Sequence, residues 1–197
     1  MFTQCSTSST HFNRGDGQDS VTTSGSDSKT LSLGGALDYN SLAFKKASND
    51  LVLDTGNSEQ ITIKNWYAAG NVHSVQKLQV IADAMAAYDA NSSNRLLNHR
   101  VQQFDFAALV NKFDQARAAT PTMTQWNLMN GLLDAHLASS DTEALGGDLA
   151  YQYGHAGTLA GVGLSVAQAE LKAPQFGNQN QVLQPEDAIK IGSITLG

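Results

Sequence analysis

The sharpest chemical pattern in the sequence is the run Gly15-Asp16-Gly17-Gln18-Asp19-Ser20-Val21. It fits the G-x-G-x-D-x-U repeat of calcium-binding parallel β-helices, in which U is a large apolar residue. Glycines at positions 15 and 17 let the backbone turn tightly and aim main-chain carbonyl oxygens into the turn. Asp19 adds a charged oxygen, and Val21 is expected to point inward. The pattern therefore predicts one side of a calcium site.

Calcium takes about six to eight oxygen ligands, so one turn supplies only part of the shell and a neighbouring turn must supply the rest. A looser copy of the pattern follows at Gly25-Ser26-Asp27. The predicted ligands are the main-chain carbonyls of Gly15 and Gly17 and the carboxylates of Asp19 and Asp27. Asp16 and Asp50 are weaker candidates. The simpler alternative is a glycine- and aspartate-rich surface turn without a metal.

Patterns for other chemistry are missing from the sequence. The histidines are His11, His73, His99, His136 and His155. No two of them have the four-residue spacing of a helical zinc site, and neither H-E-x-x-H nor G-x-S-x-G occurs. The single cysteine, Cys5, cannot form an intrachain disulfide or a cysteine-based zinc site. We expect no enzymatic activity from this chain.

Two further patterns have simple explanations. Arg14-Gly15-Asp16 spells a cell-adhesion tripeptide, but it lies inside the calcium repeat, which already explains the glycine. Trp66 ends an alternating run, Tyr67 follows it, and Trp126 lies on an apolar helical face. We expect these aromatic residues to pack in the core rather than to form a ligand platform.

The elements that must position the turn change character along the chain. Between residues 12 and 67, short apolar runs alternate with period two, which is typical of half-buried strands, and Gly, Asn and Asp separate them. From about residue 73, apolar residues recur at three- and four-residue steps, which predicts helices near 75–85, 95–117 and 124–137. The sequence thus predicts an α+β fold, with a short β-roll-like stack of strands followed by a small helical region.

These shifts divide the chain into four segments. We expect a disordered N-terminus over 1–11, a strand-rich module over 12–70 and a helical region over 71–173, with a short helix opened by Ser165. The last segment, 174–197, is expected to be irregular. The net charge of −6 disfavours binding to nucleic acid, because an acidic chain repels phosphate. No stretch approaches the roughly 18 apolar residues needed to cross a membrane.

Three runs together resemble a known family: FNRGDGQDSV, TLSLGGAL and LAFKKASNDLVLDTGNSEQITIKNWY. They are similar to the haemolysin-type calcium-binding related module of RTX (repeats-in-toxin) proteins, which follows an array of nonapeptide repeats. The resemblance implies a short β-roll extension that caps the array, with calcium in its turns. This sequence departs from the family in having one good repeat and one loose copy, with no array before them.

The segment LGGDLAYQYGHAGTLAGVGLSVAQAEL resembles the tails of large bacterial RTX-like proteins. No particular chemistry is attached to this second resemblance. The RTX resemblance as a whole implies a secreted, extracellular protein that leaves through a type I secretion apparatus, with the signal in residues 174–197. No N-terminal signal peptide is recognisable. The function expected is therefore a calcium-binding structural and secretion module. The alternative is a metal-free interaction or adhesion domain, a remnant of a larger RTX protein.

Overall fold

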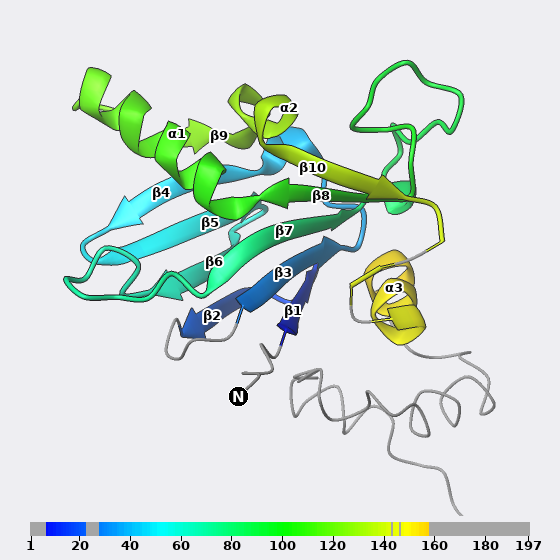
Figure 1. The fold of residues 1–197 in the computed structure, drawn as a ribbon, viewed down its shortest axis with the longest axis horizontal. Helices are drawn as coiled ribbons and strands as arrows, with labels where there is room; N and C mark the ends of the chain where they lie inside the picture. The colour runs from blue at the N-terminus through cyan, green and yellow to red at the C-terminus, as the bar shows by residue number, and fades with distance from the viewer. Residues whose placement is uncertain (1–6, 23–27, 143, 146, 158–197) are drawn as a thin grey trace, which may run out of the picture.

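The computed structural model describes residues 7–22, 28–142, 144–145 and 147–157. Within them, two five-stranded sheets form two layers (Figure 1). In order across the first sheet lie β1 (Thr7–Asn13), β3 (Ser28–Gly34), β7 (Val75–Ile81), β8 (Val101–Asp105) and β10 (His136–Ser140). Across the second lie β2 (Gln18–Thr22), β6 (Glu59–Lys64), β5 (Asp50–Gly56), β4 (Ala43–Ala47) and β9 (Trp126–Asn127). The content is mixed and mostly β, which confirms the α+β class in its coarse sense.

The first strands wind between the two layers. β1 lies in the first sheet, β2 in the second, and β3 returns to the first, where it pairs with β1 in parallel. β2 pairs in parallel with β6. The glycine turn that joins β1 to β2 therefore crosses from one sheet to the other at the end of the sandwich.

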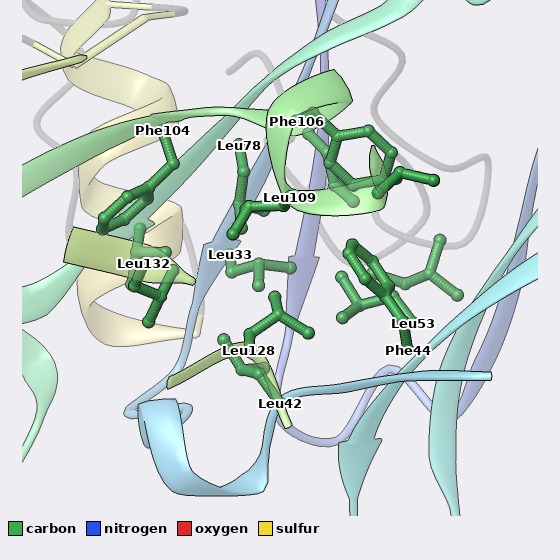
Figure 2. Close-up of a cluster of buried hydrophobic side chains, with 14 of the residues drawn as sticks. Leu33, Leu42, Phe44, Leu53, Leu78, Phe104, Phe106, Leu109, Leu128 and Leu132 are labelled. Atoms are coloured by element: carbon green, nitrogen blue, oxygen red, sulfur yellow. The ribbon is translucent and has the colours of Figure 1, made fainter. Parts of the chain in front are cut away.

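The core lies between the layers and takes residues from both (Figure 2). In the first sheet, Leu31 is in register with Leu78 and Leu33 with Val80. In the second, Leu51 pairs with Ile63 and Leu53 with Ile61, and all of these side chains are buried. The short strands predicted between residues 12 and 67 are confirmed, and β3, β4, β5 and β6 lie in this range.

Helix α1 (Phe106–Ala119) follows β8 directly. The Asp105 carboxylate caps it by accepting the Ala108 N–H at 2.8 Å, which satisfies one of the free donors of the first turn. The face that carries Phe106, Leu109, Val110 and Phe113 is buried. This face joins the same core cluster as the sheets, so α1 and the strands form one hydrophobic core.

The helix predicted near 75–85 is wrong, since these residues form β7 and the 3₁₀ helix η2 (Ala82–Ala84). β7 pairs with β3 on one side and β8 on the other. Leu78 and Val80 face the core, while Gln79 and Ile81 on the opposite face are also buried. A strand covered on both faces loses its period of two and can imitate helical spacing.

The other two predicted helices are right only in part. Of the stretch 95–117, residues 101–105 form β8, and the helix starts only at Phe106. The stretch 124–137 contains β9, the 3₁₀ helix η3 (Leu128–Asn130), the single-turn helix α2 (Leu132–Ala135) and the start of β10. Gly131 separates η3 from α2. A Cβ atom added at this position would lie 2.8 Å from the Trp126 ring, so a side chain does not fit there.

The N-terminal prediction needs the same correction, because residues 7–11 belong to β1 rather than to a disordered segment. Residues 1–6, the loose calcium repeat with Asp27, the helix expected after Ser165 and the tail 174–197 lie outside the described residues. Within the described part of the chain, no helix has the length and apolar character to cross a membrane.

Candidate functional site

The turn that connects β1 to β2 has the backbone that the sequence predicts. Gly15 and Gly17 have φ values of +100° and +81°, in the region that side chains disfavour. The Gly15 N–H donates to Glu59 Oε1 at 2.7 Å, and the Gly17 carbonyl accepts the Gln60 N–H at 3.0 Å. A carbonyl oxygen has two lone pairs, so Gly17 retains capacity for a second partner.

Asp19 lies on β2 and its side chain is partly buried. It is in register with Ile61, a core residue only 1% exposed, and paired residues point to the same side of a sheet. Asp19 therefore faces inward at the end of the sandwich, below the glycine turn. This is the orientation that a carboxylate ligand of the turn requires.

Glu59, which no sequence pattern singled out, begins β6 next to the same turn. Residues two apart on a strand share a side, so Glu59 faces inward like Ile61 and Asp19. Its Oε2 atom is buried and has no hydrogen-bond partner among the described residues. The carboxylates of Asp19 and Glu59, on the neighbouring strands β2 and β6, thus both face inward below the glycine turn. In the sequence, Glu59 is simply a carboxylate just after the Asn57-Ser58 turn. Its position beside the glycine turn follows from the pairing of β2 with β6.

The other three candidate ligands are Asp16, Asp50 and Asp27. The Asp16 carboxylate is exposed and already engaged, since it accepts the Asn13 N–H at 2.7 Å and the Tyr153 hydroxyl at 3.3 Å. Asp50 lies at the start of β5, beside Lys64 and Asn65 and away from the turn. The Asn65 N–H, and then Lys64, lower the pKa of Asp50. Asp27 lies outside the described residues.

The donors present fit a calcium ion only in part. Asp19, Glu59 and the carbonyls of Gly15 and Gly17 are hard oxygen donors of the kind that Ca²⁺ prefers. No group of three or more His, Cys, Asp or Glu side chains is arranged to hold a metal in the part of the chain that the structure describes. Calcium binding at this turn would need main-chain oxygens, water or a further turn to complete the shell.

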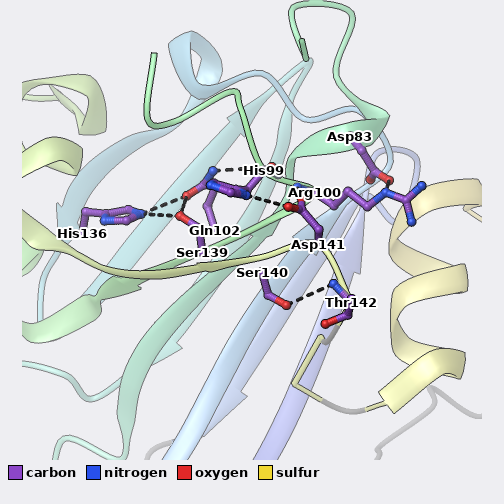
Figure 3. Close-up of polar contacts among 9 residues, drawn as sticks. All are labelled: Asp83, His99, Arg100, Gln102, His136, Ser139, Ser140, Asp141 and Thr142. Atoms are coloured by element: carbon purple, nitrogen blue, oxygen red, sulfur yellow. Dashed lines mark hydrogen bonds and ion pairs between the residues drawn. The ribbon is translucent and has the colours of Figure 1, made fainter. Parts of the chain in front are cut away.

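A second polar cluster lies where β8 and β10 pair (Figure 3). His136 Nε2 lies 3.0 Å from Ser139 Oγ, a nucleophile–base distance that the sequence did not reveal. However, Gln102 Oε1 faces both groups, at 2.9 Å from Nε2 and 2.8 Å from the serine hydroxyl. A carbonyl oxygen only accepts, so Nε2 carries the proton and Ser139 donates to Gln102.

The other ring nitrogen of His136 fits this assignment. Nδ1 faces the Arg95 guanidinium at 3.5 Å, which can only donate. Burial, followed by the charges of Arg95 and His99, lowers the pKa of His136, so the neutral ring is favoured. With its proton on Nε2, the ring cannot take a proton from Ser139. The cluster therefore joins β8 to β10 and does not form a nucleophile–base pair.

From this cluster a polar chain leads toward helix α3 (Gly147–Ala156). His99 Nδ1 contacts Asp141 Oδ2 at 2.7 Å, and this bond lowers the pKa of Asp141. The Arg100 N–H donates to Asp141 Oδ1 at 3.0 Å, and its side chain reaches Asp83 at 3.9 Å. The Asp83 side chain is only 8% exposed and accepts the Tyr151 hydroxyl.

The aromatic residues have the structural roles that were expected. Trp66 and Trp126 belong to the core and are 2% and 7% exposed. Tyr67 packs against that core, and its hydroxyl donates to Asp114 at 3.0 Å. In the adhesion-like tripeptide, the Arg14 guanidinium donates to the Ala36 carbonyl at 3.4 Å. Gly15 and Asp16 belong to the glycine turn, in which the Asp16 N–H donates to the Asn13 carbonyl.

Comparisons with known proteins add no family to this geometry. No protein-family model matches the chain, and neither a curated protein nor a solved structure matches it.

Proposed function

We propose that this chain is a calcium-binding structural module of the RTX type, a secreted protein without catalytic activity of its own. The observation that carries the proposal is the geometry below the Gly15–Gly17 turn. Asp19 and Glu59 face inward there from paired strands, and Glu59 Oε2 is buried without a hydrogen-bond partner among the described residues. Two neighbouring carboxylates repel one another, and a bound cation would relieve this repulsion.

The strand order supports the role of a β-roll cap. β1 and β2 form one coil around the glycine turn, and each lies at the edge of its sheet. Both strands pair in parallel with their inner neighbours, as the coils of a β-roll do. A preceding coil could add to both edges, in agreement with the capping role that the RTX resemblance implies.

Calcium is expected to raise the melting temperature of the protein. Extracellular calcium modules bind at about 0.1–1 mM, and free calcium at about ten times Kd would add roughly 1.4 kcal/mol to the free energy of unfolding. Thermal unfolding followed by circular dichroism, with and without 5–10 mM CaCl₂ (about ten times such a Kd), measures the shift. Asp19→Ala and Glu59→Gln should each reduce it.

Asp134→Asn is the matched control, because this carboxylate pairs with Lys112 on the helical side of the molecule. It should leave the calcium-induced shift unchanged. If the wild-type protein shows no shift, or if Asp19→Ala keeps the full shift, the calcium assignment is wrong.

Export by a type I apparatus is the second part of the proposal, and it rests on the family resemblance. We expect residues 138–197 to direct a fused reporter out of cells that carry a matching exporter. Deleting residues 174–197 should abolish secretion into the medium, measured as the extracellular fraction of the reporter. Unchanged secretion after the deletion would show that the signal lies elsewhere.

A metal-free interaction or adhesion domain is the second candidate. One observation favours it: Gly15, Asp16 and Gly17 all have hydrogen-bond partners without a cation. Under this function the turn is complete as it stands, and Glu59 acts by bracing it. The melting experiment separates the two candidates, since a metal-free domain gains no stability from calcium.

A further inference from the structure

Helix α3 contacts the candidate calcium turn directly. The Asn13 side-chain amide, at the start of the turn, donates to the Tyr153 carbonyl at 3.0 Å. The Tyr153 hydroxyl, on a side chain that is 8% exposed, donates to Asp16 Oδ1 at 3.3 Å. The same Asp16 carboxylate holds the turn closed through the Asn13 N–H. One helical residue thus contacts both ends of the turn.

The helix also contacts the turn that follows β3, which stacks on the first because Asn13 pairs with Gly34. The Gly35 N–H donates to the Gly154 carbonyl at 2.6 Å. A Cβ atom on Gly34 would lie 2.2 Å from that same carbonyl oxygen, and one on Gly154 would lie 2.6 Å from Ile81 Cγ1. Such a close approach is possible only between glycines, so α3 packs tightly against two adjacent turns.

A second anchor, made by Tyr151 and His155, holds the same turn of α3. Asp83 accepts the Tyr151 hydroxyl, and His155 Nε2 and Arg100 Nε lie 3.8 Å and 3.9 Å from the same carboxylate oxygen. Burial, followed by this bond to Asp83, raises the pKa of Tyr151 to about 12, so the phenol remains a donor at neutral pH. None of the described α3 residues belongs to the core cluster of the sandwich. Undocking the helix would therefore leave that core intact.

We propose that α3 is a regulatory element of the calcium turn, so that helix docking and calcium binding strengthen each other. The inference rests on the calcium function proposed above. A docked helix holds Asn13 and Asp16 in place and so lowers the cost of ordering the turn around a cation. Because coupling between two equilibria is reciprocal, calcium must stabilise the docked helix by the same factor.

The test combines hydrogen exchange with calcium titration of the full chain. In the wild-type protein, millimolar calcium should slow amide exchange in residues 148–156 by about fivefold or more. Gly154→Ala should undock the helix and weaken calcium binding by about tenfold, while Tyr153→Phe, which loses one hydrogen bond, should weaken it by about threefold. Gln152→Ala, an exposed position on the same helix, is the control and should change neither quantity.

Each outcome decides the proposal. If calcium binds but amide exchange in residues 148–156 is unaltered, the helix is not coupled to the turn. The coupling is then wrong, while the proposed calcium binding stands. The same holds if Gly154→Ala and Tyr153→Phe bind calcium as tightly as the wild-type protein. If the wild-type protein binds no calcium by titration, the proposed function and the coupling both fail.

Discussion

Replacing Phe44 with alanine is expected to lower the free energy of unfolding by about 3–5 kcal/mol. Phe44 lies on β4, is fully buried, and forms the contact between the second sheet and helix α1. Its ring lies 5.5 Å from Phe106, edge to face, and 5.8 Å from Phe113. On the other side it stacks on Trp126 at 6.4 Å. Removing the ring leaves a cavity bounded by two structural layers, which neither can fill without losing its own contacts.

Urea unfolding followed by tryptophan fluorescence measures this effect, because Trp126 reports directly on the site. Leu133→Ala is the matched control, since this side chain is 59% exposed and its loss should cost less than about 0.5 kcal/mol. A loss below about 1 kcal/mol for Phe44→Ala would mean that α1 does not pack on β4 as described.

The second large effect is a loss of stability in mild acid. Burial lowers the pKa of His11, on β1, to about 4 from its usual 6.5. Its Nδ1 atom is buried without a hydrogen-bond partner among the described residues, and Nε2 contacts Ser9 Oγ at 3.1 Å. The folded protein therefore holds the ring neutral, whereas the unfolded chain protonates it near pH 6.5.

Between pH 6.5 and about 4 the unfolded chain binds more protons at this residue, so the free energy of unfolding falls as the pH falls. The loss should approach about 3 kcal/mol near pH 4 and should be absent above pH 7. Urea unfolding at half-unit steps from pH 7.5 to 4 measures it.

His11→Gln keeps a polar side chain without a titrating ring and should flatten most of this slope. The slope that remains belongs in part to His136, whose pKa burial also lowers. An identical pH dependence in His11→Gln and wild type would show that His11 is not buried in its neutral form.

Local sequence patterns were enough to predict the strand-rich first part of the fold and the glycine turn within it. Ile61 and Ile63 flank the partly exposed Thr62 because β6 buries one face, and one-sided burial leaves a period of two in the sequence. Leu31 and Leu33 keep the same pattern because Ser32 between them, although buried, is polar. The tight turn could also be predicted from its glycines, since few other residues adopt the φ values of Gly15 and Gly17. These are local requirements, so local sequence records them.

The other features could not be predicted from local sequence, because the contacts that define them join residues far apart in the chain. β7 imitates a helix because side chains on both of its faces are buried, and no short window of sequence shows which faces are covered. Glu59 joins the glycine turn only through the parallel pairing of β2 with β6. Ser139 and His136 approach each other, but Gln102 from another strand determines which nitrogen carries the proton. The position of α3 depends on contacts between residues more than 100 positions apart, such as Asn13 with Tyr153 and Gly34 with Gly154. These residues meet only when the whole chain is folded.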